Sequence, residues 1–313
     1  MNTFDLQIQS TASDGKHAPQ EIVEMAAARG LRVIAITDHD TTDGVDEAMR
    51  AGEEKGVRVI PGIEISVEEH GAHLLGYGID HKNSGLVVEL EKARVSRIEG
   101  AQKMVENLRG AGFVVEWEDV AAQARGPTVA RPHIARAVLS RPENKEKLGD
   151  TATVHDFIVK FLSDKSPYYV HRSHISVENS IALIHESGGV AVWSHPAVHF
   201  RRDETSSETD YDALGSFLSE LVRGGIDGLE VFNPSHTEDD VEFLAGAAAE
   251  QGLLVTGGSD FHELGGVTGR RTEGLHAAEY PGDYEIYGYS VAGIIECLDN
   301  ALAERRAGIS PVA

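Results

Sequence analysis

Hydrophobic and polar residues alternate strictly in the segment FDLQIQ, residues 4–9. Its three apolar side chains point one way, and Asp5, Gln7 and Gln9 point the other, which predicts a β-strand. A turn over residues 10–15 follows, rich in Ser, Thr, Asp and Gly. A strand with an acid and two amides on its polar face either lines a site or is an edge strand with a solvated face. This segment alone leaves both interpretations open.

Short apolar runs and helical patterns alternate in the first part of the chain and again in its last part. We expect strands at 31–37, 57–60, 73–78, 189–193, 228–232 and 253–256, and helices at 19–29, 45–55, 177–186, 211–223, 238–251 and 290–305. Strands and helices that alternate with short connections predict a parallel sheet, either open or closed into a barrel.

The middle of the chain has a different pattern. A long helical pattern at 86–110 is followed by shorter ones at 117–123, 129–139 and 154–162, with a loop-like, charged stretch at 140–151. This predicts a helical insertion. The expected division is 1–111 for the first part of the barrel, 112–165 for the insertion and 166–313 for the second part of the barrel.

Composition narrows the function classes. The chain of 313 residues has 41% hydrophobic residues and a net charge of −23, so its overall field does not attract long nucleic acids. Cys297 is its one cysteine, which excludes an intrachain disulfide and a cysteine-rich zinc site. Residues 1–3 run directly into a strand, and no apolar run approaches the ~18–20 residues of a membrane span. We therefore expect a cytoplasmic enzyme without a membrane partner.

Imidazole and carboxylate groups recur at the ends of the expected strands. They are Asp14, His39, Glu64, His73, His195, Asp260 and His262. Taken singly, each has an ordinary structural explanation, such as a turn aspartate, a helix cap or a buried histidine. Because all strand ends of a parallel sheet or barrel open on one face, their coincidence predicts a site for more than one metal ion.

At this point the motifs resemble a known family, the PHP (polymerase and histidinol phosphatase) family. The resemblance covers nearly the whole chain and rests on SDG at 13–15, ITDHDT at 36–41, PGIEIS at 61–66, HLLGYGID at 73–80, SHP at 194–196 and TGGSDFH at 256–262. It implies a distorted (β/α)7 barrel with a trinuclear metal site. The insertion is similar to that of the stand-alone phosphoesterases that act on nucleotides, including nucleoside 3′,5′-bisphosphate phosphatases.

The resemblance also implies three metal positions. The first would use residues 7 and 9 with Glu64 and Asp260, the second Glu64, His73 and His195, and the third Asp14, His39 and His262. The family has His-x-His where this chain has Gln7 and Gln9. An amide oxygen is a neutral and poor ligand for Zn²⁺ or Fe, so the first position departs from the family pattern. We expect two or three divalent ions, with Mn²⁺ first and Fe or Zn²⁺ as alternatives.

Basic residues supply candidates for binding phosphate in this acidic protein. Arg94 and Arg97 lie three residues apart on the long helix and share a face, and Arg131 and His133 open a helical stretch of the insertion. Arg172 and Asn233 follow short extended segments and are weaker candidates.

Together these residues and the resemblance predict a metal-dependent phosphomonoesterase. Its substrate would be a small nucleotide, such as a 3′,5′-bisphosphate, a monophosphate or a short oligonucleotide end. The nucleophile would be a metal-bound hydroxide held by Asp14, His39, Glu64, His195 and His262. Two alternatives remain. Gln7 and Gln9 fit an inactive or engineered nucleotide-binding paralogue, and the barrel fits another hydrolase such as an amidohydrolase. The oligomeric state stays open.

Overall fold

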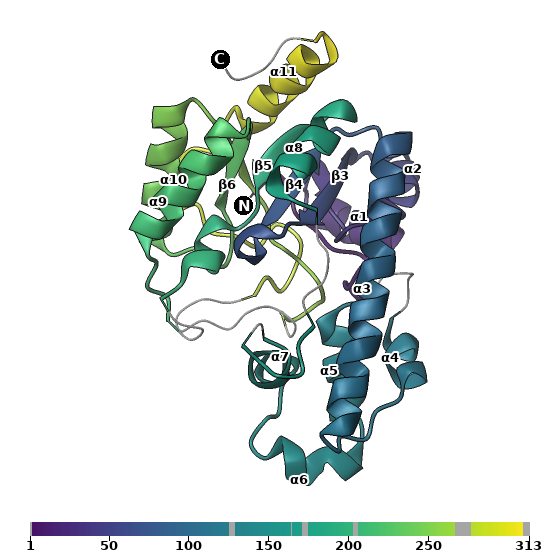
Figure 1. Cartoon of the computed structure of the whole chain (residues 1–313). Coiled ribbons are helices and arrows are strands. Elements are labelled where there is room, and N and C mark those ends of the chain that lie inside the picture. Colours follow the sequence, from purple (N-terminus) through teal and green to yellow (C-terminus); the bar gives the residue numbers. More distant parts are fainter. Residues whose placement is uncertain are drawn as a thin grey trace.

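The computed structural model describes residues 2–124, 129–163, 165–170, 175–202, 206–266 and 277–308. Within them a single sheet holds its strands in chain order (Figure 1). The strands are β1 (Phe4–Asp5), β2 (Val33–Ile36), β3 (Arg58–Ser66), β4 (His73–Tyr77), β5 (Val190–Trp193), β6 (Gly228–Phe232) and β7 (Leu254–Gly257). Neighbouring strands are parallel except at β4, which runs antiparallel to both β3 and β5.

The barrel closes where the chain after β1 bonds to the end of β7 and to the residues that follow it. The backbone N–H of Leu6 donates to the carbonyl of Gly257 at 3.1 Å, and that of Gln9 donates to Phe261 at 2.9 Å. The sheet is thereby a nearly closed seven-stranded barrel, which confirms the expected distorted (β/α)7 barrel. The regular ladder of β1 is shorter than the alternation predicts, and the segment 6–9 continues as single contacts: Thr37 N–H donates to the carbonyl of Ile8 at 2.9 Å on one side, and Ile8 bridges to Phe261 on the other.

Helices surround the barrel and form the insertion below it in Figure 1. They are α1 (Pro19–Ala28), α2 (Val45–Lys55), α3 (Ser84–Gly110), α4 (Trp117–Gln123), α5 (Arg131–Leu139), α6 (Lys145–Leu148), α7 (Val154–Phe161), α8 (Val177–Glu186), α9 (Tyr211–Arg223), α10 (Glu238–Gln251) and α11 (Ile294–Arg306), with 3₁₀ turns at Glu69–Gly71, Pro142–Asn144 and Pro196–Phe200. The stretch 140–151, expected as a loop, therefore contains helical turns. Helix α11 starts later than expected because Gly293 precedes it with a φ of 86°.

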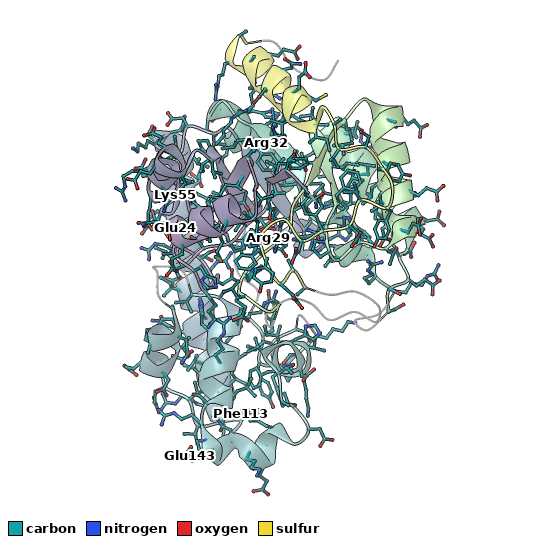
Figure 2. All side chains as sticks on the ribbon, turned by 180° about the vertical axis from the view of Figure 1, so that it is seen from behind. Glu24, Arg29, Arg32, Lys55, Phe113 and Glu143 are labelled. Carbon is teal, nitrogen blue, oxygen red and sulfur yellow. The ribbon has the colours of Figure 1, made fainter. Side chains whose placement is uncertain are left out.

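The barrel is held by two clusters of buried apolar side chains. The larger one includes Tyr77, Trp193 and Phe232, and the smaller one joins Ile8 and Ile22 with the inner side of α1 and α2. Outside the smaller cluster, the ion pair between Lys55 and Glu24 at 2.9 Å links α2 to α1, on the side that Figure 2 shows.

The insertion has a hydrophobic core of its own. It runs from Ala101 on the second half of α3 to Leu162, and Phe157 is completely buried in it. Phe113 lies in this core and Glu143 lies at the end far from the barrel (Figure 2). Helix α3 thus belongs to both cores, because Leu86 and Leu90 pack on the barrel. The exact division at 111 and 165 stays a prediction.

None of the helices in the described ranges combines the length and the apolar character that crossing a membrane requires.

Candidate metal centre

The turn after β1 is shaped by a buried carboxylate. Asp38, directly after β2, accepts hydrogen bonds from the backbone N–H and the hydroxyl of Ser10 at 2.7 and 2.6 Å, and from Ser13 Oγ at 2.5 Å. A Cβ at Gly15 would lie 2.3 Å from the Gln9 carbonyl oxygen, so the turn needs glycine at that point. The closed turn fixes Asp14 at the open end of the barrel.

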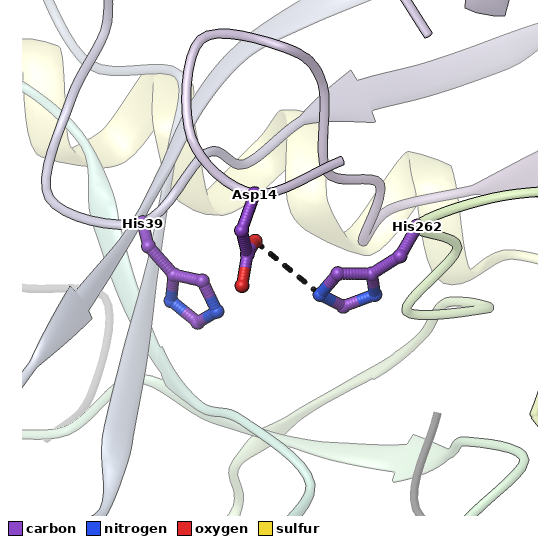
Figure 3. A group of neighbouring side chains, drawn as sticks. All are labelled: Asp14, His39 and His262. Atoms are coloured by element: carbon purple, nitrogen blue, oxygen red, sulfur yellow. Dashed lines mark ion pairs between the residues drawn. The ribbon is translucent and has the colours of Figure 1, made fainter. Parts of the chain in front are cut away.

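Three predicted ligands meet at this end: Asp14 lies between His39 and His262 (Figure 3). Ligand atoms of the three lie within 4.8 Å of one another, and His262 Nε2 is 3.4 Å from Asp14 Oδ1. Burial alone would raise the pKa of Asp14, but the imidazoles of His262 and His39 outweigh it and hold that pKa below its usual range. Burial opposes a charge on His262 as well, yet Asp14 and Asp260 raise its pKa to about 10.

Glu64 is the centre of a second group. It lies within β3, completely buried, and its Oε1 is 2.9 Å from His73 Nδ1 and 3.1 Å from His195 Nε2. Its Oε2 is 3.7 Å from His39 Nδ1, and Glu64, His39 and His73 form a second cluster with metal-binding geometry. Burial would raise the pKa of Glu64, but the histidines around it, His39 first, hold it well below the usual value. The carboxylate is therefore ionised and available as a ligand.

His73 reaches this group by a route that the sequence interpretation did not include. It opens β4 and does not follow a strand. Because β4 is antiparallel to its neighbours, its first residue lies at the same end as the last residues of the parallel strands.

The backbone is left-handed at several site residues. Asp40, His195 and Asp260 have φ angles of 53°, 30° and 50°. Residues other than glycine adopt this region at a cost in free energy, and such residues gather where function requires a fixed backbone direction.

Burial also raises the pKa of the Asp260 carboxyl to about 6.

Of the two interpretations that the alternation left open, the contacts of Gln7 and Gln9 favour a strand that faces Glu64. Gln9 and Gln7 donate from Nε2 to Glu64 Oε2 at 2.6 and 3.2 Å, and both are completely buried. Gln7 also donates to Ser194 Oγ at 2.9 Å. The edge-strand alternative is therefore wrong.

The orientation of the Gln7 amide is set by its neighbours. Asn233 Oδ1 accepts the backbone N–H of Ser235 at 2.9 Å, which leaves Asn233 Nδ2 to donate to Gln7 Oε1 at 3.0 Å. A backbone N–H can only donate, so this chain of bonds fixes which end of each amide carries nitrogen. Gln7 consequently presents N–H groups, and not its oxygen, to Glu64. A cation between Gln7 and Glu64 would be repelled by those N–H groups.

These contacts show which metal positions the residues fit. Asp14 Oδ1 and His39 Nδ1 are buried and have no hydrogen-bond partner within the described ranges, as expected of atoms that ligate an ion. Imidazole and carboxylate sets of this kind suit Mn²⁺, Fe or Zn²⁺. Within the part of the chain that the structure describes, the two clusters around Asp14 and Glu64 have such ligand geometry. The position between Gln7, Gln9 and Glu64 does not fit a metal ion, because both glutamines turn amide N–H groups, and not oxygens, toward Glu64.

Sequence reasoning missed several polar groups here. Glu230 lies in the middle of β6, accepts the backbone N–H of His195 at 2.9 Å, and has a pKa that burial raises well above its usual value. His199 Nε2 lies 3.1 Å from His195 Nδ1, and Ser194 Oγ donates to Glu64 Oε1 at 3.0 Å. The one available signal for Glu230 was a single acid within the apolar run GLEVF.

The predicted phosphate-binding residues are placed differently from one another. Arg97 is buried, forms an ion pair with Asp40, and donates to Ser66 Oγ at 3.0 Å. Arg94 is paired with Glu91 on its own helix at 2.5 Å. The two arginines, expected to share one face, therefore contact different partners.

The remaining candidates also have defined positions. Arg131 lies over the ring of Tyr169 at 5.7 Å and donates to the carbonyl of Leu162, which directs it into the insertion. Asn233 uses its amide on Gln7, Glu230 and Ser235, and its contact with substrate stays a prediction. Arg172 lies outside the described residues.

His133 is a buried residue of helix α5 in the insertion. Its Nδ1 accepts the backbone N–H of Ala130 at 3.0 Å, so a neutral ring carries its proton on Nε2. Burial lowers the pKa of His133 to about 4, while Asp14 opposes that change and the cations Arg136, Lys16 and Arg97 add to it. The ring of His133 is therefore neutral near pH 7.

Comparison with known proteins agrees with this geometry. The model of the PHP domain matches residues 5–212. The 3′,5′-nucleoside bisphosphate phosphatase of Chromobacterium violaceum is 32% identical over 272 residues, which are 85% of this chain and 89% of that protein. A 5′-3′ exoribonuclease of Haemophilus influenzae is 31% identical over 265 residues, 83% of this chain and 89% of its own.

A solved structure from Bifidobacterium adolescentis, assigned as a metal-dependent phosphoesterase, superposes with a TM-score of 0.72 at 32% identity and covers 88% of this chain and 92% of its own. The chain therefore belongs to the PHP family and is a metal-dependent hydrolase of phosphoric esters.

Proposed function

We propose that this enzyme removes a phosphomonoester from a small nucleotide, with a nucleoside 3′,5′-bisphosphate as the first candidate. The observation that carries the proposal is the pair of clusters formed by Asp14, His39 and His262 and by His39, Glu64 and His73. The named relatives act on bisphosphates and on RNA, which is consistent with nucleotide chemistry.

We further propose two divalent ions per chain, Mn²⁺ in preference to Fe or Zn²⁺. Asp14, His39 and His262 would hold one, and Glu64, His73 and His195 would hold the other. Such ions, when bound, polarise the phosphoryl oxygens and lower the pKa of a water molecule.

The protein's own groups supply the remaining functions. Arg97 holds Asp40 and Ser66, which fixes the loop after β2 against the end of β3. A neutral His133 carries its proton on Nε2, because its Nδ1 accepts the backbone N–H of Ala130, and this N–H would be available to a phosphate oxygen. Residues 112–165 would cover the site and exclude long polymers.

The rival function is a nucleotide-binding protein without turnover, and Gln7 and Gln9 are the reason to retain it. The test is phosphate release by the Mn²⁺-loaded protein from a nucleoside 3′,5′-bisphosphate, a 5′-monophosphate and a short oligoribonucleotide. We expect release from the bisphosphate and its loss in His39→Ala. Tight nucleotide binding without release from any of the three would favour the rival.

A further inference from the structure

The carboxyl group of Glu230 joins two series of hydrogen bonds that both lead to Glu64. Its Oε2 accepts the backbone N–H of His195 at 2.9 Å and Nδ2 of Asn233 at 3.0 Å. His195 Nε2 lies 3.1 Å from Glu64 Oε1. Asn233 orients the amide of Gln7, whose Nε2 donates to Glu64 Oε2 at 3.2 Å. One oxygen of Glu230 thus supports the contacts on both oxygens of Glu64.

The backbone of His195 requires such support. Its φ of 30° and ψ of 58° are left-handed, a region that residues other than glycine adopt at a cost in free energy. Pro196 follows directly, and the residue before a proline favours an extended backbone. The bond from the His195 N–H to Glu230 therefore stabilises a conformation that the local sequence disfavours. In this conformation the ring of His195 reaches Glu64.

The place of Glu230 in the barrel is costly without such a role. It lies within the apolar strand β6, is completely buried, and its Oε1 has no hydrogen-bond partner among the described residues. A buried polar atom without a partner destabilises the folded state, and an apolar side chain would avoid this cost. The register of β6 shifts between Glu230 and Phe232, and such irregularities re-aim side chains next to functional sites.

We propose that Glu230 is a positioning residue for the metal position that Glu64, His73 and His195 form. It fixes the backbone of His195 directly and, through Asn233, the amide beside Glu64. The inference rests on the proposed function, which includes an ion at this position. Both partners of Glu230 Oε2 are N–H donors, so the accepting oxygen carries the role, and a neutral acceptor of the same shape can replace it.

The test is calorimetric titration of the metal-free protein with Mn²⁺. The parent is compared with Glu230→Met, which loses both bonds, and with Glu230→Gln, whose amide oxygen can accept both. Thr256→Val is the matched control, because Thr256 is also completely buried and lies opposite Glu230 in the ladder of β6 and β7. We expect the Kd of one ion to rise about 10–100-fold in Glu230→Met, and both Kd values to stay near those of the parent in Glu230→Gln and in the control.

A second background identifies the affected ion. In His262→Ala the position around Asp14 is impaired, so the remaining binding reports the position around Glu64. Adding Glu230→Met should weaken that remaining binding by the same factor as in the parent. A merely structural Glu230 would lower the unfolding temperature of Glu230→Met without changing either Kd, and this result overturns the proposal. Equal losses of affinity in Glu230→Met and Glu230→Gln overturn it as well.

If Glu230→Met does not fold, Glu230→Asp decides, since aspartate keeps the carboxylate but is one methylene shorter. A Kd at least several-fold weaker for one ion supports the proposal, and unchanged Kd values overturn it. The proposed function fails separately, because the titration contains no substrate. A parent that binds two ions but releases phosphate from no nucleotide would refute the function and leave the role of Glu230 intact.

Discussion

Restoring imidazoles on the first strand should create a third metal position. In the double variant Gln7→His with Gln9→His, two neutral amide donors to Glu64 are replaced by side chains that can ligate a cation. The two amides contact the same oxygen of Glu64 at 3.2 and 2.6 Å, so both replacements face one point. Asp260, on the loop after β7, would complete the ligand set.

The magnitude follows from the bonds that change. Each amide bond that histidine does not replace, such as that from Asn233 to Gln7 Oε1, should lower the metal-free unfolding free energy by about 0.5–1.5 kcal/mol. A third ion at 100 times its Kd should then raise it by about 2.7 kcal/mol. An added Lewis acid on the phosphoryl group contributes several kcal/mol, so a rate gain on the order of 100-fold is expected.

The assay is a metal count by elemental analysis, beside phosphate release from a nucleoside 3′,5′-bisphosphate in Mn²⁺. The parent, both single variants and the double variant are compared, with Gln20→His on the exposed face of α1 as control. Each single change should give less than half of the gain of the double change, because both ligands serve one ion. A folded double variant with the metal content and the rate of the parent would refute this reasoning, as would three stoichiometric ions in the parent.

Three further predictions concern binding and stability. His262→Ala should weaken metal binding, measured by equilibrium dialysis, by more than about 100-fold. Loss of a residue that only supports a ligand costs about 10–100-fold, and a direct ligand should cost more. Phe157→Ala should lower the unfolding free energy in urea by about 3–5 kcal/mol, whereas Val114→Ala on the insertion surface should cost under about 1 kcal/mol. Burial lowers the pKa of His236 to about 4. Between pH about 6.5 and 4 only the unfolded state takes up this proton, so the free energy of unfolding should fall as the pH drops through that range. Urea titrations at successive pH values should show a shallower fall for His236→Gln.

Much of the barrel and the meeting of most candidate ligands were predictable, because both follow from local periodicity. Apolar runs alternating with amphipathic helices imply parallel strands, and parallel strands place the residues that follow them on one face. His39 and His195 follow this rule, and the structure brings both to Glu64. His73 reaches the same place from the start of an antiparallel strand, and local pattern carries no information about strand direction.

Groups whose role depends on contacts distant in sequence were not predictable. Arg94 and Arg97 are neighbours on a helix surface, but one is paired outside and the other is buried, because the barrel wall covers only one of them. Glu230 lies in an apolar strand, where composition suggests core packing. Arg136 looks like an ordinary helix residue in the sequence, and only the folded chain shows that its Nη2 is buried without a hydrogen-bond partner among the described residues.

The long helix α3 sets the distance and the angle between the barrel and the insertion. Its first turns are anchored in the barrel at Leu86 and Leu90, and its later turns carry the insertion core from Ala101 onward. Every residue of an α-helix adds about 1.5 Å of length and about 100° of rotation. A single deletion between Leu90 and Ala101 would therefore swing the insertion by more than a quarter of a circle relative to the barrel. The length of this connecting segment is thus constrained by angular phase, even where its individual side chains are exposed and replaceable.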